Sequence, residues 1–188
     1  MTEARGKKSV SGDYRIFVGA FPEGELAERI QSIREKYDAT TARITPPHVT
    51  LAGTYWRSGP PTLENETETV RRMEIIQGIL PPFELQLGGV RTFRGERPIV
   101  YLGVTVNKPL VEARNLLLSV LGMDKHKEFT PHLTLAMRLP WEEAWAMISE
   151  LSDHELHTAQ WAAPIRELRL MLRGPKDPAW HCIYTLTL

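Results

Sequence analysis

The sequence predicts an α+β protein with a bilobal, duplicated fold, in which two antiparallel sheets backed by helices enclose a central cleft. Two observations lead to this prediction. The hexapeptides at 47–52 and 131–136 agree at every position but one, and their histidines lie 84 residues apart. Around each hexapeptide a helix, the motif strand, a second helix and a hairpin are expected in the same order. This repetition indicates two related halves.

Length and composition favour one globular domain. The 188 residues suffice for a sizeable core, and 23 basic against 23 acidic residues argue against a large non-specific nucleic-acid surface. The single cysteine, Cys182, fits a reducing compartment, and no Cys/His spacing resembles a structural zinc site. No apolar run reaches the length of a membrane span. We therefore expect a cytoplasmic monomer without cofactor, metal or membrane partner, with a disordered tail over 1–12 and one two-lobed domain over 13–188.

In the first half, the strand and helix patterns alternate. Residues 14–20 follow a two-residue period and are rich in residues that favour β-structure, which predicts a strand. Between 26 and 37, apolar residues recur at spacings of four, three and four, which predicts a helix with one core-facing stripe. The prolines at 46 and 47 restrict the residues before them to extended geometry, and they deliver His48 to the start of its strand. A Pro/Gly loop over 57–62 and a helix over 64–80 are expected next.

In the second half, the same elements recur after a hairpin. Two antiparallel strands are expected at 83–93 and 98–106, with a bulge at Gly88-Gly89. A helix over 110–121 should end at Gly122. The remaining expected elements are the second motif strand (129–138), a helix (141–151), a charged loop through 157, and a hairpin of 165–172 and 181–188.

Each hexapeptide reads as a strand with a chemical face and a core face. The two-residue period of a strand places His48 with Thr50, and His132 with Thr134, on one face, while the apolar residues between them point to the core. Two imidazoles can divide proton transfer between a base and an acid, and two hydroxyls can donate hydrogen bonds to phosphate oxygens. Nothing in a near-symmetric pair tells which histidine is the base.

The two His-x-Thr-Leu copies resemble those of the 2H phosphoesterase superfamily, in particular its LigT-like branch of 2′-5′ RNA ligases and 2′,3′-cyclic phosphodiesterases. The opening strand, 15–20, and the closing hairpin around 180–184 are also similar to that branch. The resemblance implies a metal-independent enzyme that opens 2′,3′-cyclic phosphates of RNA ends or small nucleotides to 2′-phosphates. It also implies 2′-5′ ligation by the same site.

Three further residues are candidates for substrate contact. Arg138 lies six residues after His132 and could clamp a phosphate, although members of the superfamily tend to carry an arginine one position earlier, where this chain has Met137. The alternative is a solvated strand end. Phe17 could pack against a nucleobase, but a strand phenylalanine is usually core. Tyr55 follows the first motif and could line the rim of the cleft.

Two other functions remain open from the sequence. A non-catalytic module that binds RNA ends or nucleotides would use the same residues for recognition alone. A hydrolase with Cys182 as nucleophile would need a base beside the thiol, and no pattern in the sequence places one there.

Overall fold

The computed structural model describes residues 14–57, 63–122 and 128–188, without the side chains of 54–57 and 63–65. The expected tail over 1–12 lies outside the described residues. The elements in chain order are β1 (Tyr14–Ala20), α1 (Gly24–Ile44), β2 (Val49–Arg57), α2 (Leu63–Glu74), β3 (Phe83–Phe93), β4 (Ile99–Val104), α3 (Lys108–Leu121), β5 (His132–Ala136), α4 (Trp141–Glu150), α5 (Glu155–Thr158), β6 (Trp161–Ile165), β7 (Glu167–Arg173) and β8 (His181–Thr187).

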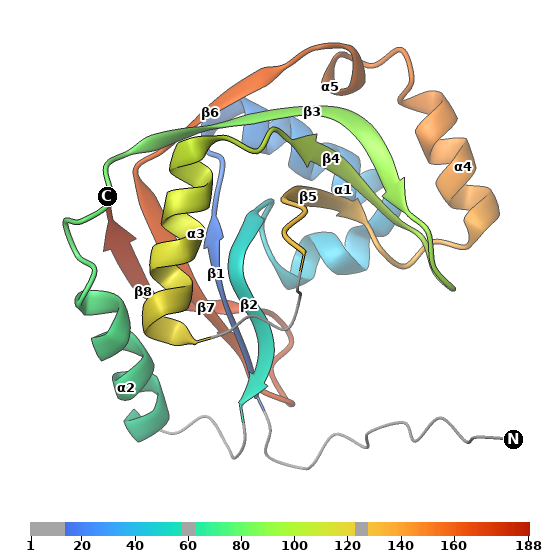
Figure 1. Ribbon diagram of the computed structural model, residues 1–188. Coiled ribbons are helices and arrows are strands. Elements are labelled where there is room, and N and C mark those ends of the chain that lie inside the picture. Colours follow the sequence, from blue (N-terminus) through green and yellow to red (C-terminus); the bar gives the residue numbers. More distant parts are fainter. Residues whose placement is uncertain (1–13, 58–62, 123–127) are drawn as a thin grey trace, which may run out of the picture.

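The described strands form one curled sheet in the order β6-β3-β4-β5-β2-β1-β7-β8, and all neighbours are antiparallel (Figure 1). The α+β class and the antiparallel pairing are thus confirmed, whereas the two predicted sheets are joined into one continuous sheet. The two halves join at the motif strands, β2 and β5, through the single register pair Val49–Leu133. The remainder of β2 has no register partner in β5, so the two strands meet only at this point.

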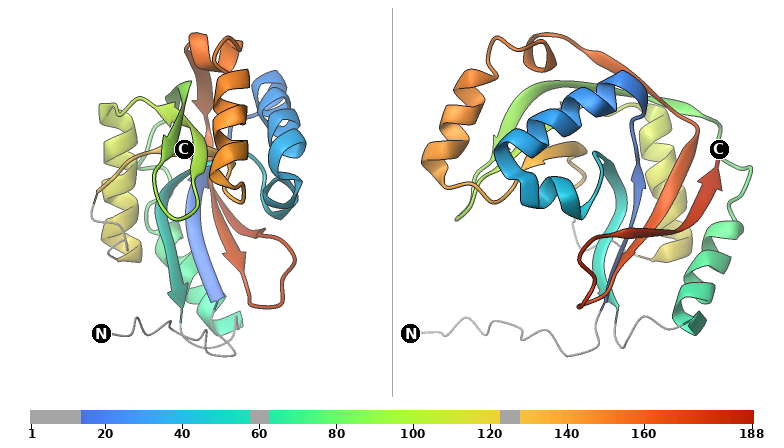
Figure 2. Two further views of the ribbon diagram at one scale, coloured as in Figure 1. Left: turned by 90° about the vertical axis from the view of Figure 1, so that its right-hand side faces the viewer. Right: turned by 180° about the vertical axis from the view of Figure 1, so that it is seen from behind.

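Helices cover the sheet from two sides. Figure 2 shows α2 and α3 on one side of the sheet and α1 and α4 on the other. Each of the two longest helices packs against a motif strand, α1 against β5 and α3 against β2. Each of these helices therefore supports the motif strand of the other half.

The motif strands show the expected alternation. Val49 and Leu51 in β2, like Leu133 and Leu135 in β5, are fully buried in the main hydrophobic cluster. The histidine and the threonine that alternate with them in each motif are only half-buried. The two-residue period has therefore separated a core face from a face that remains accessible.

The predicted bulge at Gly88-Gly89 and the predicted helix end at Gly122 are both confirmed. The register between β3 and β4 shifts from Gly88 to Val90, which is the expected bulge. Gly122 ends α3 with φ 96°, a left-handed conformation that favours glycine, and its N–H donates to the carbonyl of Leu118.

Other element boundaries differ from the prediction for local reasons. α2 ends at Glu74 because the next backbone hydrogen bonds span three residues instead of four, and Gly78 follows with φ 73°. Residues 155–158 form the short helix α5 instead of a loop, since His154 accepts a hydrogen bond from the N–H of Leu156. β5 is shorter than predicted and ends at Ala136.

The strand β6 was not predicted. Its Pro164 argues for a break, because proline cannot donate to a strand ladder. In the structure β6 pairs only with β3 and forms an edge of the sheet, where proline is tolerated.

Within the described ranges, none of the helices combines the length and apolar character needed to cross a membrane.

Candidate active site

One cavity of about 590 Å³ is lined by residues of both motifs. His48, just before β2, and Thr50 in β2 contribute to one part of its wall, and His132 and Thr134 in β5 contribute to another. The structure thus brings together the four residues that the sequence singled out. The join between β2 and β5 explains this convergence, because it sets the two half-buried faces beside each other.

Both histidines make the same hydrogen bond. Nδ1 of His48 lies 2.9 Å from the carbonyl oxygen of Pro46, and Nδ1 of His132 lies 2.8 Å from that of Thr130. A carbonyl oxygen can only accept, so each Nδ1 carries the proton that it donates. Nε2 is therefore the nitrogen that changes its protonation state in both rings. The carbonyl fixes the ring orientation as well as the tautomer.

The ring of His48 stacks on phenylalanine faces. Its centroid lies 4.7 Å from that of Phe17, with 24° between the planes, and 5.4 Å from that of Phe21, with 28°. Gly19, between the two phenylalanines, permits this arrangement, because a Cβ there would lie 2.9 Å from Cε2 of Phe17. The absence of a side chain at Gly19 therefore lets both rings lie against the imidazole.

The ring of His132 meets aromatic side chains at an angle. Its centroid lies 4.8 Å from that of Phe93 at 83° between the planes, and 5.3 Å from that of Tyr101 at 62°. Tyr101 comes from β4, which pairs with β5, just as Phe17 comes from β1, which pairs with β2. The two motifs thus have aromatic partners on corresponding strands, but in different orientations.

The pKa of His48 is lowered to about 4, chiefly by burial and in smaller part by the positive charges of Arg34 and His132. The hydrogen bond to the Pro46 carbonyl opposes this shift. His48 is therefore neutral at pH 7 and can accept a proton. Burial also lowers the pKa of Arg34 to about 10, against the opposing charges of Asp38 and Glu35, so this guanidinium keeps its charge at neutral pH.

The cavity is strongly cationic although the chain has no net charge. Five arginines line it: Arg15, Arg34, Arg114, Arg138 and Arg173. Among the described lining residues, the only carboxylate is that of Glu128. Sequence reasoning missed four of these arginines, because they come from β1, α1, α3 and β7 and no local pattern links them. The only local signal was Arg15, which lies two residues before Phe17 and hence on the same strand face.

The three weaker candidates have different outcomes. Arg138 lines the cavity, but the argument that placed it on a strand face is wrong, because β5 ends two residues earlier. Its position follows instead from Asp38, whose Oδ2 accepts a hydrogen bond of 3.0 Å from the N–H of Met137. Phe17 is both core and cavity wall, since it is 2% exposed yet lines the site. The side chain of Tyr55 lies outside the described residues.

The structure also bears on a possible metal site and on Cys182 as a nucleophile. Among the residues that the structure describes, no group of three or more His, Cys, Asp or Glu side chains could hold a metal ion. Cys182 is exposed on β8 and is not one of the residues that line the cavity. Its Sγ donates to the carbonyl of Tyr184, so the described contacts show no base beside it.

Comparisons with known proteins agree with this geometry. The crystal structure of E. coli LigT in apo form has a TM-score of 0.64 with this chain at 20% identity, and the match covers 95% of this chain and 99% of LigT. TT0787 of Thermus thermophilus has a TM-score of 0.59 at 18% identity, covering 93% of this chain and 97% of TT0787. At such identity these matches show a shared fold. No curated protein matches the sequence.

The family comparison is made on the sequence itself. The model of the 2′-5′ RNA ligase superfamily matches residues 22–177, which include both His-x-Thr motifs and most of the sheet. The resemblance inferred from the two motifs is thereby confirmed: this chain belongs to the 2′-5′ RNA ligase superfamily of 2H phosphoesterases.

Proposed function

We propose that this protein is a phosphodiesterase that opens 2′,3′-cyclic phosphates of RNA ends or small nucleotides to 2′-phosphates. Membership of the superfamily implies phosphodiesterase or ligase chemistry in general. The observation that carries the finer proposal is the shared cavity, in which both histidines donate from Nδ1 to a carbonyl, so that Nε2 is the nitrogen that exchanges a proton. Structures of E. coli LigT complexed with 3′-AMP and with ATP support a nucleotide as ligand.

The two histidines take complementary roles in this proposal. His48, neutral at pH 7 because its pKa is lowered, accepts a proton from water through Nε2. The water oxygen forms a bond to phosphorus while the bond from phosphorus to the ribose 3′-oxygen breaks. His132, in its protonated form, gives its Nε2 proton to that oxygen. With a ribose 5′-hydroxyl in place of water, the same proton transfers join a 2′-5′ linkage.

The threonines and arginines act on the phosphate in this scheme. Thr50 and Thr134 donate hydrogen bonds to the non-bridging oxygens and so hold phosphorus in line with the two imidazoles. The arginines that line the cavity supply a positive potential where negative charge develops. The proton transfers themselves require no metal, because each is made by a side chain.

The test is conversion of a short RNA that ends in a 2′,3′-cyclic phosphate, with EDTA present. We expect the wild-type protein to produce a 2′-phosphate end and each of His48→Ala and His132→Ala to be slower by about 10²-fold or more. His154→Ala is the matched control, since His154 caps α5 and does not line the cavity. Unchanged rates in both motif variants would overturn the proposal. Binding of the RNA without conversion would indicate a recognition module instead.

A further inference from the structure

Two tryptophans of α4 stack on each other at the protein surface. Trp141 and Trp145 lie one helical turn apart, with ring centroids 5.6 Å apart and 29° between the planes. Trp145 is 50% exposed and Trp141 is half-buried, whereas Ala144 and Met147 on the core face of the same helix are fully buried. Large apolar side chains that gather on an exposed face mark a binding surface. The tryptophan pair is therefore a candidate for one.

The hairpin of β3 and β4 holds the tryptophan pair beside its tip. Nε1 of Trp141 donates a hydrogen bond of 3.2 Å to the carbonyl of Gly95, and Figures 1 and 2 show α4 and this hairpin side by side. The tip carries Arg94 and Arg97, both exposed, with Glu96 as the one carboxylate between them. An exposed aromatic surface and a cationic tip thus lie next to each other.

The acidic residues at the start of α4 lie off the tryptophan stripe. Glu142 and Glu143 follow Trp141 in the chain and are exposed. Successive residues of a helix are about 100° apart, so Trp145 lies about 40° from Trp141 around the axis, and the two glutamates lie about 100° and 200° from it. Their carboxylates therefore do not share the side on which the two indole rings stack.

The tryptophan pair is close to the cavity along two stretches of chain. Phe93, which lines the cavity, lies two residues before Gly95, and Arg138, which also lines it, lies three residues before Trp141. Three residues of chain span at most about 11 Å. A polymer whose end occupies the cavity can thus reach the tryptophan pair with its next units.

We propose that the tryptophan pair and the arginines of the hairpin tip bind the single-stranded RNA that precedes the reacting end, so that the preferred substrate is an RNA and not a mononucleotide. This inference rests on the proposed function, which places the cyclic phosphate in the cavity. A base stacks on the indole of Trp145, while Arg94 and Arg97 neutralise phosphates of the same strand. A single strand of RNA satisfies the aromatic and the cationic part of this surface together.

The first test compares adenosine 2′,3′-cyclic phosphate with a hexaadenylate that ends in a 2′,3′-cyclic phosphate. The wild-type protein should have a kcat/KM at least tenfold higher for the hexamer. In Trp145→Ala this preference should fall about fivefold or more, the effect of losing one stack of a base on an aromatic ring. Trp145→Tyr keeps an aromatic face and should retain most of the preference.

Ile79→Ala is the matched control for Trp145→Ala, because it also shortens an exposed apolar side chain, 58% exposed, and should keep the preference. Far-ultraviolet circular dichroism and thermal unfolding would show that the variants are folded. No preference for the hexamer in the wild-type protein, or a preference that Trp145→Ala keeps in full, would overturn the proposal.

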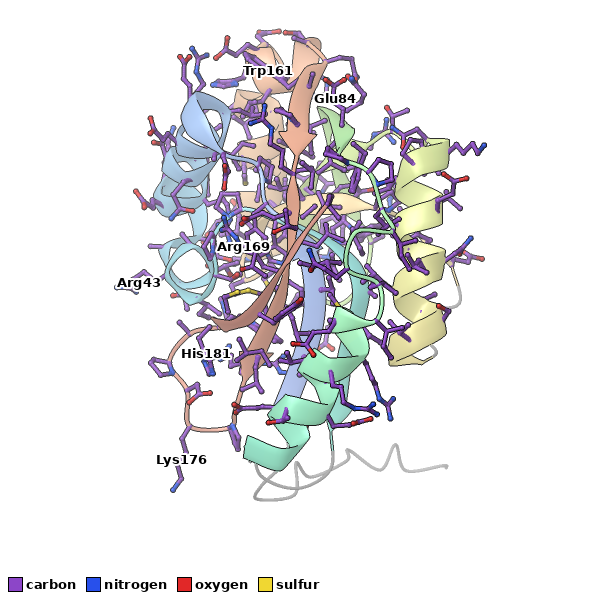
Figure 3. All side chains as sticks on the ribbon, turned by 90° about the vertical axis from the view of Figure 1, so that its left-hand side faces the viewer. Arg43, Glu84, Trp161, Arg169, Lys176 and His181 are labelled. Atoms are coloured by element: carbon purple, nitrogen blue, oxygen red, sulfur yellow. The ribbon has the colours of Figure 1, made fainter. Side chains whose placement is uncertain are left out.

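The role of the hairpin tip is tested through salt. In the double variant Arg94→Gln/Arg97→Gln, the dependence of log Kd for the hexamer on log salt should become shallower by about 1.4, since each phosphate neutralised on a single strand contributes about 0.7. Arg166→Gln/Lys176→Gln removes the same charge from two other exposed positions and should keep the slope. Figure 3 shows Lys176 at the tip of the loop between β7 and β8. Equal slopes in the two double variants would refute the contact of the tip with phosphates.

A binding measurement separates this inference from the proposed function. If the wild-type protein converts neither substrate, the proposed function fails, but the RNA surface still requires a hexaadenylate with a 2′-phosphate end to bind at least tenfold tighter than adenosine 2′-phosphate. Trp145→Ala should reduce that difference in Kd about fivefold or more. Equal affinities in the wild-type protein would refute the RNA surface whether or not turnover is seen. A dimer in sedimentation equilibrium that Trp145→Ala dissociates would assign the tryptophan pair to a second copy of this chain and overturn RNA binding there.

Discussion

The two copies of the motif make the same hydrogen bond but lie in different surroundings. His48 stacks face to face on Phe17, whereas His132 meets Phe93 and Tyr101 at steep angles. The hydrogen bond is local, since Nδ1 of each ring donates to the carbonyl of the residue two positions earlier. The surroundings come from other strands. A repeated sequence can therefore place two equivalent imidazoles, while the neighbouring strands determine which aromatic side chains each ring packs against.

The motif strands are also anchored by side chains of opposite charge. Arg114 of α3 donates through Nη1 to the carbonyl of Leu51 in β2 at 2.6 Å. Asp38 of α1 accepts from the N–H of Met137, just after β5. Each anchor comes from the helix that crosses to the other half. The protein thus uses different chemistry to support two strands with nearly the same sequence.

The largest expected effect tests the division of labour between the two rings. His48→Asn and His132→Asn should each lower kcat by about 10²-fold or more, because asparagine can keep a hydrogen bond but cannot transfer a proton. The double variant should be far less impaired than the product of the two effects, since the residues act as a unit. Rates of cyclic phosphate opening at saturating substrate would show this. A multiplicative loss would mean that the rings act independently.

The motif and its strand period were sufficient to predict the four central residues. His48, Thr50, His132 and Thr134 follow from local alternation, which depends on backbone geometry alone. The continuous sheet was not predictable in this way, because the halves join through one register pair that no local pattern specifies.

The arginines of the cavity show a second limit of sequence reasoning. The amphipathic pattern of 26–37 places Arg34 on the water-facing side of the helix, yet its side chain is 1% exposed, and a packed charge there goes against the usual preference of arginine. Arg173 lies 158 residues from Arg15 in the sequence, and only the β1–β7 register brings the two together. Contacts between distant elements therefore determine the electrostatics of the site.

The next prediction concerns how the free energy of unfolding depends on pH, and it can be tested without substrate. The pKa of His48 is about 4 in the folded protein, against about 6.5 for an unperturbed histidine. Between these values the unfolded chain binds more protons, so the contribution to stability is present above about pH 6.5 and is lost as the pH falls through 4. The loss should be at most about 3 kcal/mol. Urea unfolding at several pH values should show it in the wild-type protein, and His48→Asn should lack that part of the dependence.

A smaller effect is expected at the anchor of the second motif. Asp38 is non-helical (φ −144°, ψ 69°) inside α1, and its Oδ1 accepts from the N–H of Thr41 at 3.0 Å, as a helix N-cap does. Asp38→Ala removes this cap and the partner of Met137 N–H, so the free energy of unfolding should fall by about 2 kcal/mol. Chemical denaturation would measure the change.

Two control variants sharpen that result. Asp38→Asn keeps an oxygen acceptor and should lose less, and Asp153→Ala removes an exposed aspartate and should change little. Burial alone would raise the pKa of Asp38, but the hydrogen bonds from Met137 and Thr41, with the charge of Arg138, lower it. The stabilisation should therefore be present above about pH 4 and be lost below it. An Asp38→Ala protein as stable as the wild type would show that water replaces the carboxylate.

The smallest expected effect tests why the two histidines differ. Arg34 is 1% exposed, lines the cavity, and its charge contributes to the lowered pKa of His48. Arg34→Gln should raise that pKa, but by less than the shift that burial causes, since burial makes the larger contribution. The acid limb of kcat/KM, which reports the free enzyme, should move to higher pH accordingly.

Arg34→Lys is the matched control for this shift, because it keeps the positive charge at acid pH while it changes the shape of the side chain. If both variants move the acid limb equally, packing around His48 is responsible and the charge of Arg34 is not. If neither moves it, burial lowers the pKa of His48 without a contribution from the charge of Arg34. A shift in Arg34→Gln only would show that a helix residue outside both motifs helps to make one of two equivalent histidines the base.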